Sequence, residues 1–413
     1  MTQGKAEDVL WIASAGGAPS GTMILGLPLL RRAVLAAERA GFGRILVEET
    51  AAGGTRSLVE ETRAQVLDPM DSVPDLGSGR LVVLSGSVIP QVRWLRDLRQ
   101  RPVEPGRLVL DPGCAAVLET GELRNAVSIL RRRGARAPFD ALSALFPAAA
   151  PLAPSGERFE ITSAQDLGRA EYWLLQSLIK DTEGFMSRHV ERRISLALSR
   201  RLASTRVTPN AMTLVSVAVG VLGAALFLRP TAGAPLAGAL LVLAHSILDG
   251  CDGELARLKF QESRFGGVLD FWGDNVVHCA LFGAIALSWS RAAGAGWPLL
   301  LGAAALLGTL FSAAFVYRHT MAQVQEGPLF TSVSREPGSL LSRMADALAR
   351  RDFLYLLVLL AALGKSHWFL ALAAAGSPIY FLLLLAIARA GRRRQGNAPE
   401  TAAKVAVRVN NPG

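Results

Sequence analysis

The residues best suited to chemistry are four aspartates between positions 249 and 274, in a part of the chain that is otherwise apolar enough to lie in a bilayer. An aspartate at the centre of a membrane helix costs about 2.5–3.5 kcal/mol on insertion scales, so it needs a cationic partner or a bound metal ion. Asp249 and Asp252 are three residues apart, and Asp270 and Asp274 are four apart, so each pair lies on one helix face. Two such faces, when opposed, predict an oxygen-rich site for divalent cations.

The neighbours of these aspartates favour a phosphate-bearing substrate. Gly253 and Ala256 follow at helical intervals and are small enough for a ligand to approach the backbone, and Gly266 lies one turn before Asp270. Arg257 adds a planar guanidinium that suits phosphate. An all-carboxylate site without thiolate or imidazole in register suits Mg²⁺ or Mn²⁺ better than zinc, and two such ions can clamp a phosphoryl group.

Two other interpretations of the aspartates are weaker. They could form structural ion pairs with Arg257, Lys259 and Arg264 at a helix end, but ionisable groups inside membranes are functional by default. A calcium loop of the EF-hand type needs aspartates at alternate positions in a solvated loop, whereas here the gap is three residues in an apolar flank.

The segment resembles the CDP-alcohol phosphotransferase family, also called CDP-alcohol phosphatidyltransferases, whose signature D-x2-D-G-x2-A-R-x8-G-x3-D-x3-D it fills without a departure. The resemblance implies attack by an acceptor hydroxyl on the β-phosphorus of a CDP-linked alcohol, with release of CMP. It also implies that a TPN-x-x-T segment helps to bind the cytidine end of the donor, although this segment could be only a helix start. The implied metal ligands are Asp249, Asp252, Asp270 and Asp274, with Asp274 also the general base; the implied donor-binding residues are Asp249, Gly253, Ala256, Arg257, Gly266, Asn210 and Thr213; Lys259 and Arg264 are candidate acceptor-binding residues.

Composition divides the chain into two classes of sequence. With 413 residues, a mean hydropathy of +0.32 and 51% hydrophobic residues, the chain can hold a soluble domain and a membrane domain. The net charge of +10 is concentrated beside the apolar stretches, which favours contact with anionic lipid headgroups over nucleic-acid binding. The three scattered cysteines predict neither disulfides nor a zinc site.

The apolar stretches predict six membrane helices after a surface helix. Basic residues gather before the first span, between the second and third, between the fourth and fifth, and after the last, so we expect both termini and the aspartates to face the cytoplasm, with no cleaved signal peptide. The arginines of 180–204 predict an amphipathic helix at the membrane surface, or else a solvated connector. The expected segments are spans at about 208–228, 233–257, 265–289, 296–317, 352–364 and 367–388 within a membrane domain 207–390, a juxtamembrane region 161–206, and a basic, disordered tail 391–413.

Residues 1–160 predict a cytoplasmic α/β domain with a mostly parallel sheet. A strand at 9–13, a glycine-rich turn, a helix at 29–40 and a strand at 45–47 form a βαβ pattern. The runs from Gly26 and from Leu81 resemble sugar-phosphate nucleotidyltransferases. However, the turn has Ser20, Thr22 and Met23 where that family has cationic residues, and Ser87 stands where it has a metal-binding aspartate. Triphosphate chemistry therefore lacks electrostatic support, and we expect an inactive relative.

The combination of the two domains is similar to di-myo-inositol phosphate phosphate synthases, which join CDP-inositol to inositol phosphate. A lipid donor such as CDP-diacylglycerol is an alternative, because the degenerate N-terminal domain has no evident means of making CDP-inositol. A second alternative is an active cytidylyltransferase domain, which would make the enzyme bifunctional. A non-enzymatic membrane protein is the least favoured alternative, because the aspartate signature is intact. The expected partners are a CDP-alcohol donor, an alcohol or polyol-phosphate acceptor, the lipid bilayer and a second copy of the chain in a homodimer.

Overall fold

The structure is a computed structural model, and its chain divides into two compact units that are described separately. The first comprises Met1–Leu178 with Ala203–Thr205 and Leu258–Phe260, and the second comprises Ile179–Leu202, Arg206–Arg257 and Gln261–Gly413. The residues that the structure describes are 7–13, 20–49, 53–68, 72–132, 138–146, 150–153, 155–179, 187–321 and 353–396.

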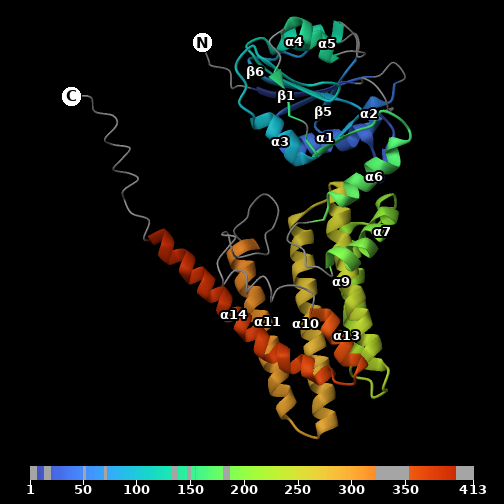
Figure 1. Ribbon diagram of the computed structural model, residues 1–413, viewed down its shortest axis with the longest axis vertical. Helices are drawn as coiled ribbons and strands as arrows, with labels where there is room; N and C mark the ends of the chain where they lie inside the picture. Colours follow the sequence, from blue (N-terminus) through green and yellow to red (C-terminus); the bar gives the residue numbers. More distant parts are fainter. Residues whose placement is uncertain are drawn as a thin grey trace, which may run out of the picture. The chain divides into compact units, whose positions relative to one another are not determined.

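The N-terminal unit is a seven-stranded sheet between two layers of helices, with strand order β10-β8-β9-β6-β1-β4-β5. Strand β1 pairs in parallel with β4 and β6, and β9 pairs antiparallel with both β6 and β8, so the sheet is mostly parallel, as predicted. Figure 1 shows α1 and α3 on one face of this sheet and α4 and α5 on the other. The elements are β1 (Glu7–Ala13), α1 (Leu29–Ala40), β4 (Arg44–Glu48), α2 (Thr55–Leu58), β5 (Ala64–Leu67), β6 (Gly79–Ser85), α3 (Val92–Gln100), β8 (Leu108–Asp111), β9 (Ala115–Thr120), α4 (Leu123–Arg132), α5 (Pro138–Leu145) and β10 (Ala150–Pro151).

The predicted βαβ pattern is confirmed by β1, α1 and β4. Residues 9–13 of β1 are all buried because helices cover both faces of the sheet, which explains the continuous apolar run of this strand. Helix α1 ends where Gly41 takes a left-handed conformation with φ of 88°. A short hairpin and a second two-stranded antiparallel sheet lie outside this pattern: β2 (Met23–Ile24) pairs with β3 (Leu27–Pro28), and β7 (Val88–Pro90) pairs with β11 (Arg158–Glu160). The first of them occupies the turn after β1, where the sequence predicted only a loop.

The last helix of the N-terminal unit, α6 (Asp166–Gln176), is fixed at its start by one carboxylate. Asp166 Oδ2 accepts hydrogen bonds from the hydroxyls of Thr162 and Ser163, at 2.8 and 3.1 Å, and from their backbone N–H groups, at 3.1 and 2.9 Å. Donation from the Thr162 side chain and from the two backbone groups lowers the pKa of Asp166 to about 2.

The second unit consists mainly of long apolar helices. In the described part of the chain, five helices are long and apolar enough to cross a membrane, which identifies the chain as an integral membrane protein. The fifth expected span, at about 352–364, is represented by a shorter helix of 10 residues, and the residues just before it are outside the described part of the chain. A count of six therefore stays a prediction. The helices are α8 (Pro209–Leu226), α9 (Ala234–Lys259), α10 (Arg264–Ala293), α11 (Trp297–Val316), α13 (Phe353–Ala362) and α14 (Ser366–Gly396).

Polar residues set the starts of the helices that carry the aspartates and their neighbours. The Thr208 side chain accepts a hydrogen bond from the Ala211 N–H, and Pro209 occupies the first turn of α8. The Ser263 side chain caps α10 in the same way by accepting from the Gly266 N–H. Close packing then joins the helices: a Cβ added at Gly238 of α9 would lie 2.6 Å from the carbonyl oxygen of Gly223 in α8. Larger residues at this crossing would force the two helices apart.

A helix is observed over part of residues 180–204, and its expected place at the membrane surface stays a prediction. Residues 180–186 are outside the described part, a π-helical turn η1 (Ser187–Glu191) follows, and α7 (Arg192–Ala203) continues from it. At the other end, α14 extends to Gly396, so residues 391–396 of the expected disordered tail are helical, and the rest of that tail is outside the described residues.

We expect Asp166→Ala to loosen the start of α6 in a pH-dependent way. Because the folded-state pKa is lowered, the carboxylate stabilises the fold above its unfolded pKa of about 3.9, and this contribution is lost as the pH falls towards 2. Hydrogen–deuterium exchange of peptides covering 160–176, corrected for intrinsic rates, should be faster in the variant at pH 7 and pH 5. The difference should shrink at pH 3. An equal difference at all three values would contradict the assignment.

Candidate active site

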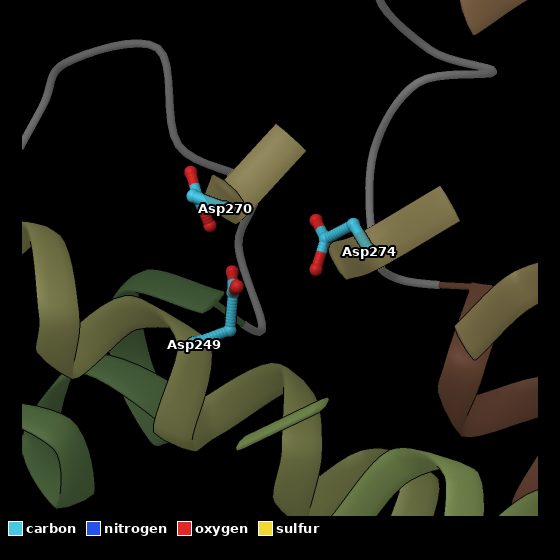
Figure 2. Close-up of side chains that lie close together, drawn as sticks. All are labelled: Asp249, Asp270 and Asp274. Atoms are coloured by element: carbon cyan, nitrogen blue, oxygen red, sulfur yellow. The ribbon is translucent and has the colours of Figure 1, made fainter. Parts of the chain in front are cut away.

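Two helices of the membrane unit bring three of the four aspartates together. Asp249 comes from α9, and Asp270 and Asp274 come from successive turns of α10. One carboxylate oxygen of each lies within 4.8 Å of the other two, and Figure 2 shows the three side chains directed towards one another. Asp249 is buried, with 4% of its surface exposed, whereas Asp270 and Asp274 are half-buried. The pairing of opposed acidic faces expected from the spacing is therefore present.

The fourth aspartate, Asp252, lies one turn after Asp249 and is hydrogen-bonded within the protein. Its Oδ2 accepts from the hydroxyl of Thr213 in α8, and both residues are buried. Thr213 Oγ1 also lies 3.2 Å from the carbonyl oxygen of Pro209. The sequence predicted Thr213 as a donor-binding residue, and the structure places it against the acidic segment itself. The metal-binding role predicted for Asp252 stays a prediction.

The start of α8 meets the start of α10 at the two other predicted binding residues. A Cβ added at Gly266 would lie 2.9 Å from Asn210 Oδ1 and 3.1 Å from Ser263 Oγ. A side chain at position 266 would therefore displace one of these polar groups, which gives a physical reason for glycine here. Asn210 and Gly266, 56 positions apart in the printed sequence, are neighbours in space.

The remaining predicted residues occupy the last turns of α9 and the start of α10. A Cβ added at Gly253 would lie 3.8 Å from an Arg257 guanidinium nitrogen, and Ala256 and Arg257 are half-buried. Lys259 Nζ donates to the carbonyl oxygen of Thr205 at 2.8 Å, which gives this lysine a structural contact. Arg264 is exposed at the first position of α10. Acceptor binding by Lys259 and Arg264 stays a prediction.

A histidine that the sequence reasoning missed lies against the proposed base. His245 Nε2 is 3.4 Å from Asp274 Oδ1, and the histidine side chain is 5% exposed. Its Nδ1 lies 2.9 Å from the carbonyl oxygen of Ser216 and donates to it, because a carbonyl oxygen only accepts. His245 is one helical turn before Asp249, so an i, i+4 search from the first aspartate would have found it.

The side chains fit a hard divalent cation. Three carboxylate oxygens converge from two helices, and the buried Oδ1 of Asp270 has no hydrogen-bond partner among the described residues. Oxygen-only donors suit Mg²⁺ and Mn²⁺. Clustered carboxylates repel one another, and a bound cation offsets that repulsion. The geometry thus agrees with the metal site expected from the sequence.

The N-terminal unit has a second polar cluster, at the end of β6, where the resemblance to nucleotidyltransferases would place a metal site. Ser85 and Ser87 are buried, with their hydroxyl oxygens 2.8 Å apart. Asp111 is paired with Arg158 at 2.5 Å. The Cys114 thiol donates to Glu160 at 3.4 Å, and burial raises its pKa to about 12. The cysteine is therefore a neutral thiol at physiological pH.

Part of the membrane unit is similar to a known family. Residues 206–335 match the CDP-alcohol phosphatidyltransferase family. The bifunctional IPC transferase and DIPP synthase of Thermococcus kodakarensis is 41% identical over 119 residues, which are 29% of this chain and 26% of that protein. The phosphatidylinositol phosphate synthase of Corynebacterium glutamicum is 35% identical over 120 residues, which are 29% of this chain and 53% of that protein. The matches thus span between about a quarter and a half of these curated relatives.

A solved structure is also similar in part. The Mycobacterium tuberculosis phosphatidylinositol phosphate synthase with CDP-DAG bound matches 46% of this chain and 92% of its own, at 23% identity and a TM-score of 0.33. The sequence matches show that the chain contains a CDP-alcohol phosphatidyltransferase domain. The family and these relatives are transferases by name. The range matched by the family, 206–335, contains the positions of the aspartate signature, 249–274.

We expect Thr213→Val to impair the site without unfolding the helices. The substitution keeps the side-chain shape but removes the hydroxyl that holds Asp252. Loss of a hydrogen bond that orients a metal ligand typically costs about 10–100-fold, so CMP release from a CDP-alcohol should fall within that range. Thr213→Ser should retain most of the rate. Thr309→Val, the same change on α11, where the hydroxyl bonds only Ala305 O and Ser377 among the contacts observed, is the matched control and should behave as wild type.

Proposed function

We propose that the protein is a membrane-embedded, metal-dependent CDP-alcohol phosphotransferase, which transfers a substituted phosphate from a CDP-linked alcohol to an acceptor hydroxyl. The observation that carries this proposal is the convergence of Asp249, Asp270 and Asp274 from two helices of the matched domain. Three carboxylates within a few ångströms are unfavourable in an apolar region unless they bind cations, and the matched family supplies a substrate with a diphosphate.

We assign the metal-binding and donor-binding roles to separate sets of residues. Asp249, Asp252, Asp270 and Asp274 would hold two Mg²⁺ or Mn²⁺ ions, while Gly253, Ala256 and Arg257 would line the donor and Gly266, Asn210 and Thr213 would surround its cytidine end. When bound, the metal ions neutralise charge that develops on the diphosphate during transfer. Arg257 would add a guanidinium that pairs with phosphate oxygens through two parallel hydrogen bonds.

The transfer itself is a displacement at phosphorus. The acceptor hydroxyl oxygen forms a bond to the β-phosphorus, and the bond from that phosphorus to the oxygen bridging the α-phosphate breaks. CMP leaves with the bridging oxygen, and the product is a phosphodiester. Asp274 is proposed to take the hydroxyl proton, since it is the last carboxylate of the cluster along α10 and is half-buried.

For the substrates, we propose CDP-inositol as donor and inositol phosphate as acceptor. Support comes from relatives named bifunctional IPC transferase and DIPP synthase, of which four are 31–41% identical to the aligned part of this chain. A second candidate donor is CDP-diacylglycerol, because the domain is also 35% identical over 120 residues to a phosphatidylinositol phosphate synthase. Parallel assays with the two donors and one inositol phosphate acceptor would separate the candidates, since a lipid-linked product partitions into organic solvent.

We further propose six membrane helices, with both termini and the aspartates on the cytoplasmic side and the chain paired as a homodimer. The charge asymmetry of the loops supports this orientation. Loops on the other side carry only Arg229, Arg291 and Lys365. The N-terminal domain is proposed to be an inactive relative of the nucleotidyltransferases, because Arg158 already neutralises Asp111 and serine replaces a metal-binding aspartate at position 87.

Asp270→Asn and Asp274→Asn should each abolish CMP release while the protein stays folded in the membrane. Each change removes one negative charge from the cluster but keeps nearly the same shape. Turnover of purified protein in detergent should also require Mg²⁺ or Mn²⁺ and stop with a chelator. Asp97→Asn, on the soluble helix α3, is a matched control and should release CMP at the wild-type rate. Substantial turnover by either site variant, or turnover without a metal ion, would refute the two-metal mechanism.

The full chain should release no pyrophosphate from CTP and inositol phosphate or other sugar phosphates. The N-terminal domain has no lysine between Lys5 and Lys180, so its glycine-rich turn has none to stabilise a leaving pyrophosphate. With a supplied CDP-alcohol, the same preparation should still produce CMP, which shows that the protein is intact. Steady formation of a CDP-polyol would show instead that the enzyme is bifunctional and makes its own donor.

A further inference from the structure

A fully buried carboxylate lies beside the aspartate cluster but belongs to neither acidic face. Glu254 is on α9, two residues after Asp252, and its side chain is 0% exposed. Two residues rotate an α-helix by about 200°, so Glu254 leaves the helix on a different side from Asp252. The signature that describes the family allows any residue at this position. The proposed reaction therefore assigns Glu254 no role.

Two side chains of the juxtamembrane helix α7 hold this carboxylate. Arg192 Nη1 is 2.7 Å from Glu254 Oε1, and Ser195 Oγ donates to the same oxygen at 2.7 Å. The Cys251 thiol of α9 in turn lies 3.6 Å from the Ser195 carbonyl oxygen. Ser195 is 1% exposed, and the Arg192 side chain is 17% exposed. The contact is thus a desolvated, charge-assisted network rather than a surface ion pair.

The arginine lies across α9 beside the first metal-binding aspartate. A Cβ added at Gly250 would be 3.0 Å from Arg192 Nη1, so the glycine leaves room for the guanidinium to pass. Gly250 directly follows Asp249 in the chain. The contacts between α7 and α9 therefore extend along the turn of α9 that carries Asp249 and Asp252.

The start of α7 is also held from a second direction. Tyr355 of α13 donates its hydroxyl hydrogen to Glu191 Oε1 at 3.2 Å, and Glu191 is 5% exposed. Glu191 is the last residue of the π-helical turn η1, directly before Arg192. The two anchors meet at adjacent residues, so the junction of η1 and α7 is fixed between α9 and α13.

We infer that Arg192 and Ser195 are positioning residues that set the rotation of α9 through Glu254, and so keep Asp249 in register with Asp270 and Asp274. The three metal-ligand candidates come from two helices, and a small rotation of α9 moves Asp249 while Asp270 and Asp274 stay in place. A misplacement of about 1 Å is enough to impair such a site. This inference rests on the proposed metal site.

If Arg192 acted only through its charge, its removal would strengthen cation binding instead of weakening it. Removal of the guanidinium leaves the negative charge of Glu254 uncompensated near the cluster, and that charge alone would attract divalent cations more strongly. A positioning role predicts weaker cation binding, because Asp249 leaves its place. The direction of the change therefore distinguishes the two roles.

The test is titration of Mn²⁺ into the full chain in lipid nanodiscs, with free Mn²⁺ measured by electron paramagnetic resonance in the absence of substrate. Groups that orient metal ligands contribute about 10–100-fold to affinity, so Arg192→Met should bind Mn²⁺ at least about tenfold more weakly. Arg192→Lys should recover part of the loss, and Ser195→Ala, which keeps the ion pair, should show a smaller loss. Thr309→Val, which removes a hydroxyl that contacts Ala305 O and Ser377 outside this network, is the control and should bind as wild type.

The outcomes separate this inference from the proposed function. Wild-type protein that binds no Mn²⁺ would overturn the proposed metal site, and the inference with it. Wild-type binding together with equal or tighter binding by both Arg192→Met and Ser195→Ala would overturn the inference alone. If Arg192→Met fails to fold, as judged by its melting temperature and size-exclusion profile, Arg192→Lys and Ser195→Ala decide by the same criterion: weaker binding supports the positioning role, and unchanged binding overturns it.

Discussion

The repulsion among Asp249, Asp270 and Asp274 is the constraint on which the membrane unit depends. Their oxygens lie within 4.8 Å of one another. Two carboxylates about 4 Å apart repel one another by roughly 4 kcal/mol where the effective dielectric constant is about 20, and by more in drier surroundings. When all three carboxylates are ionised and no cation is bound, the helices must hold these side chains together against that force. Rigid packing around the site is therefore a requirement for binding and not only a consequence of folding.

Several contacts supply that rigidity where the helices carry the aspartates. Thr213 fixes Asp252 from α8, and His245 contacts Asp274 across to α10 while it donates to the Ser216 carbonyl. Glycines let the helices approach: a Cβ at Gly273 would lie 2.6 Å from Val217, and one at Gly220 would lie 2.9 Å from His245. Polar tethers and small residues thus act on the same three helices. Each of these polar contacts joins two different helices, so the site is fixed in more than one direction.

The elements with strong local signals were predictable from the sequence. Helix 29–40 agrees with α1 because its apolar residues are periodic and Gly41 ends it. The membrane helices follow from the lengths of apolar runs, and the meeting of the two acidic faces follows from spacing. The hairpin of β2 and β3 was not predictable, because each strand has only two residues and depends on pairing with the other. The arginines of 180–204 predicted an amphipathic helix at the membrane surface, but the contacts of Arg192 and Ser195 with Glu254 were not predictable, because Glu254 is about 60 residues away in the sequence.

The polar clusters at Asp111 and at Glu254 show that the pairing of charged side chains depends on contacts that are distant in the sequence. In the N-terminal unit, Asp111 is neutralised by Arg158, and Ser85 and Ser87 are hydrogen-bonded to each other, so the groups satisfy one another. In the membrane unit, the cation of Arg192 is paired with Glu254, on a side of α9 turned away from Asp252. That pairing directs the positive charge of Arg192 to a supporting carboxylate, on a different side of α9 from the one that carries Asp252. Which basic residue meets which carboxylate therefore depends on contacts between helices that local sequence does not fix.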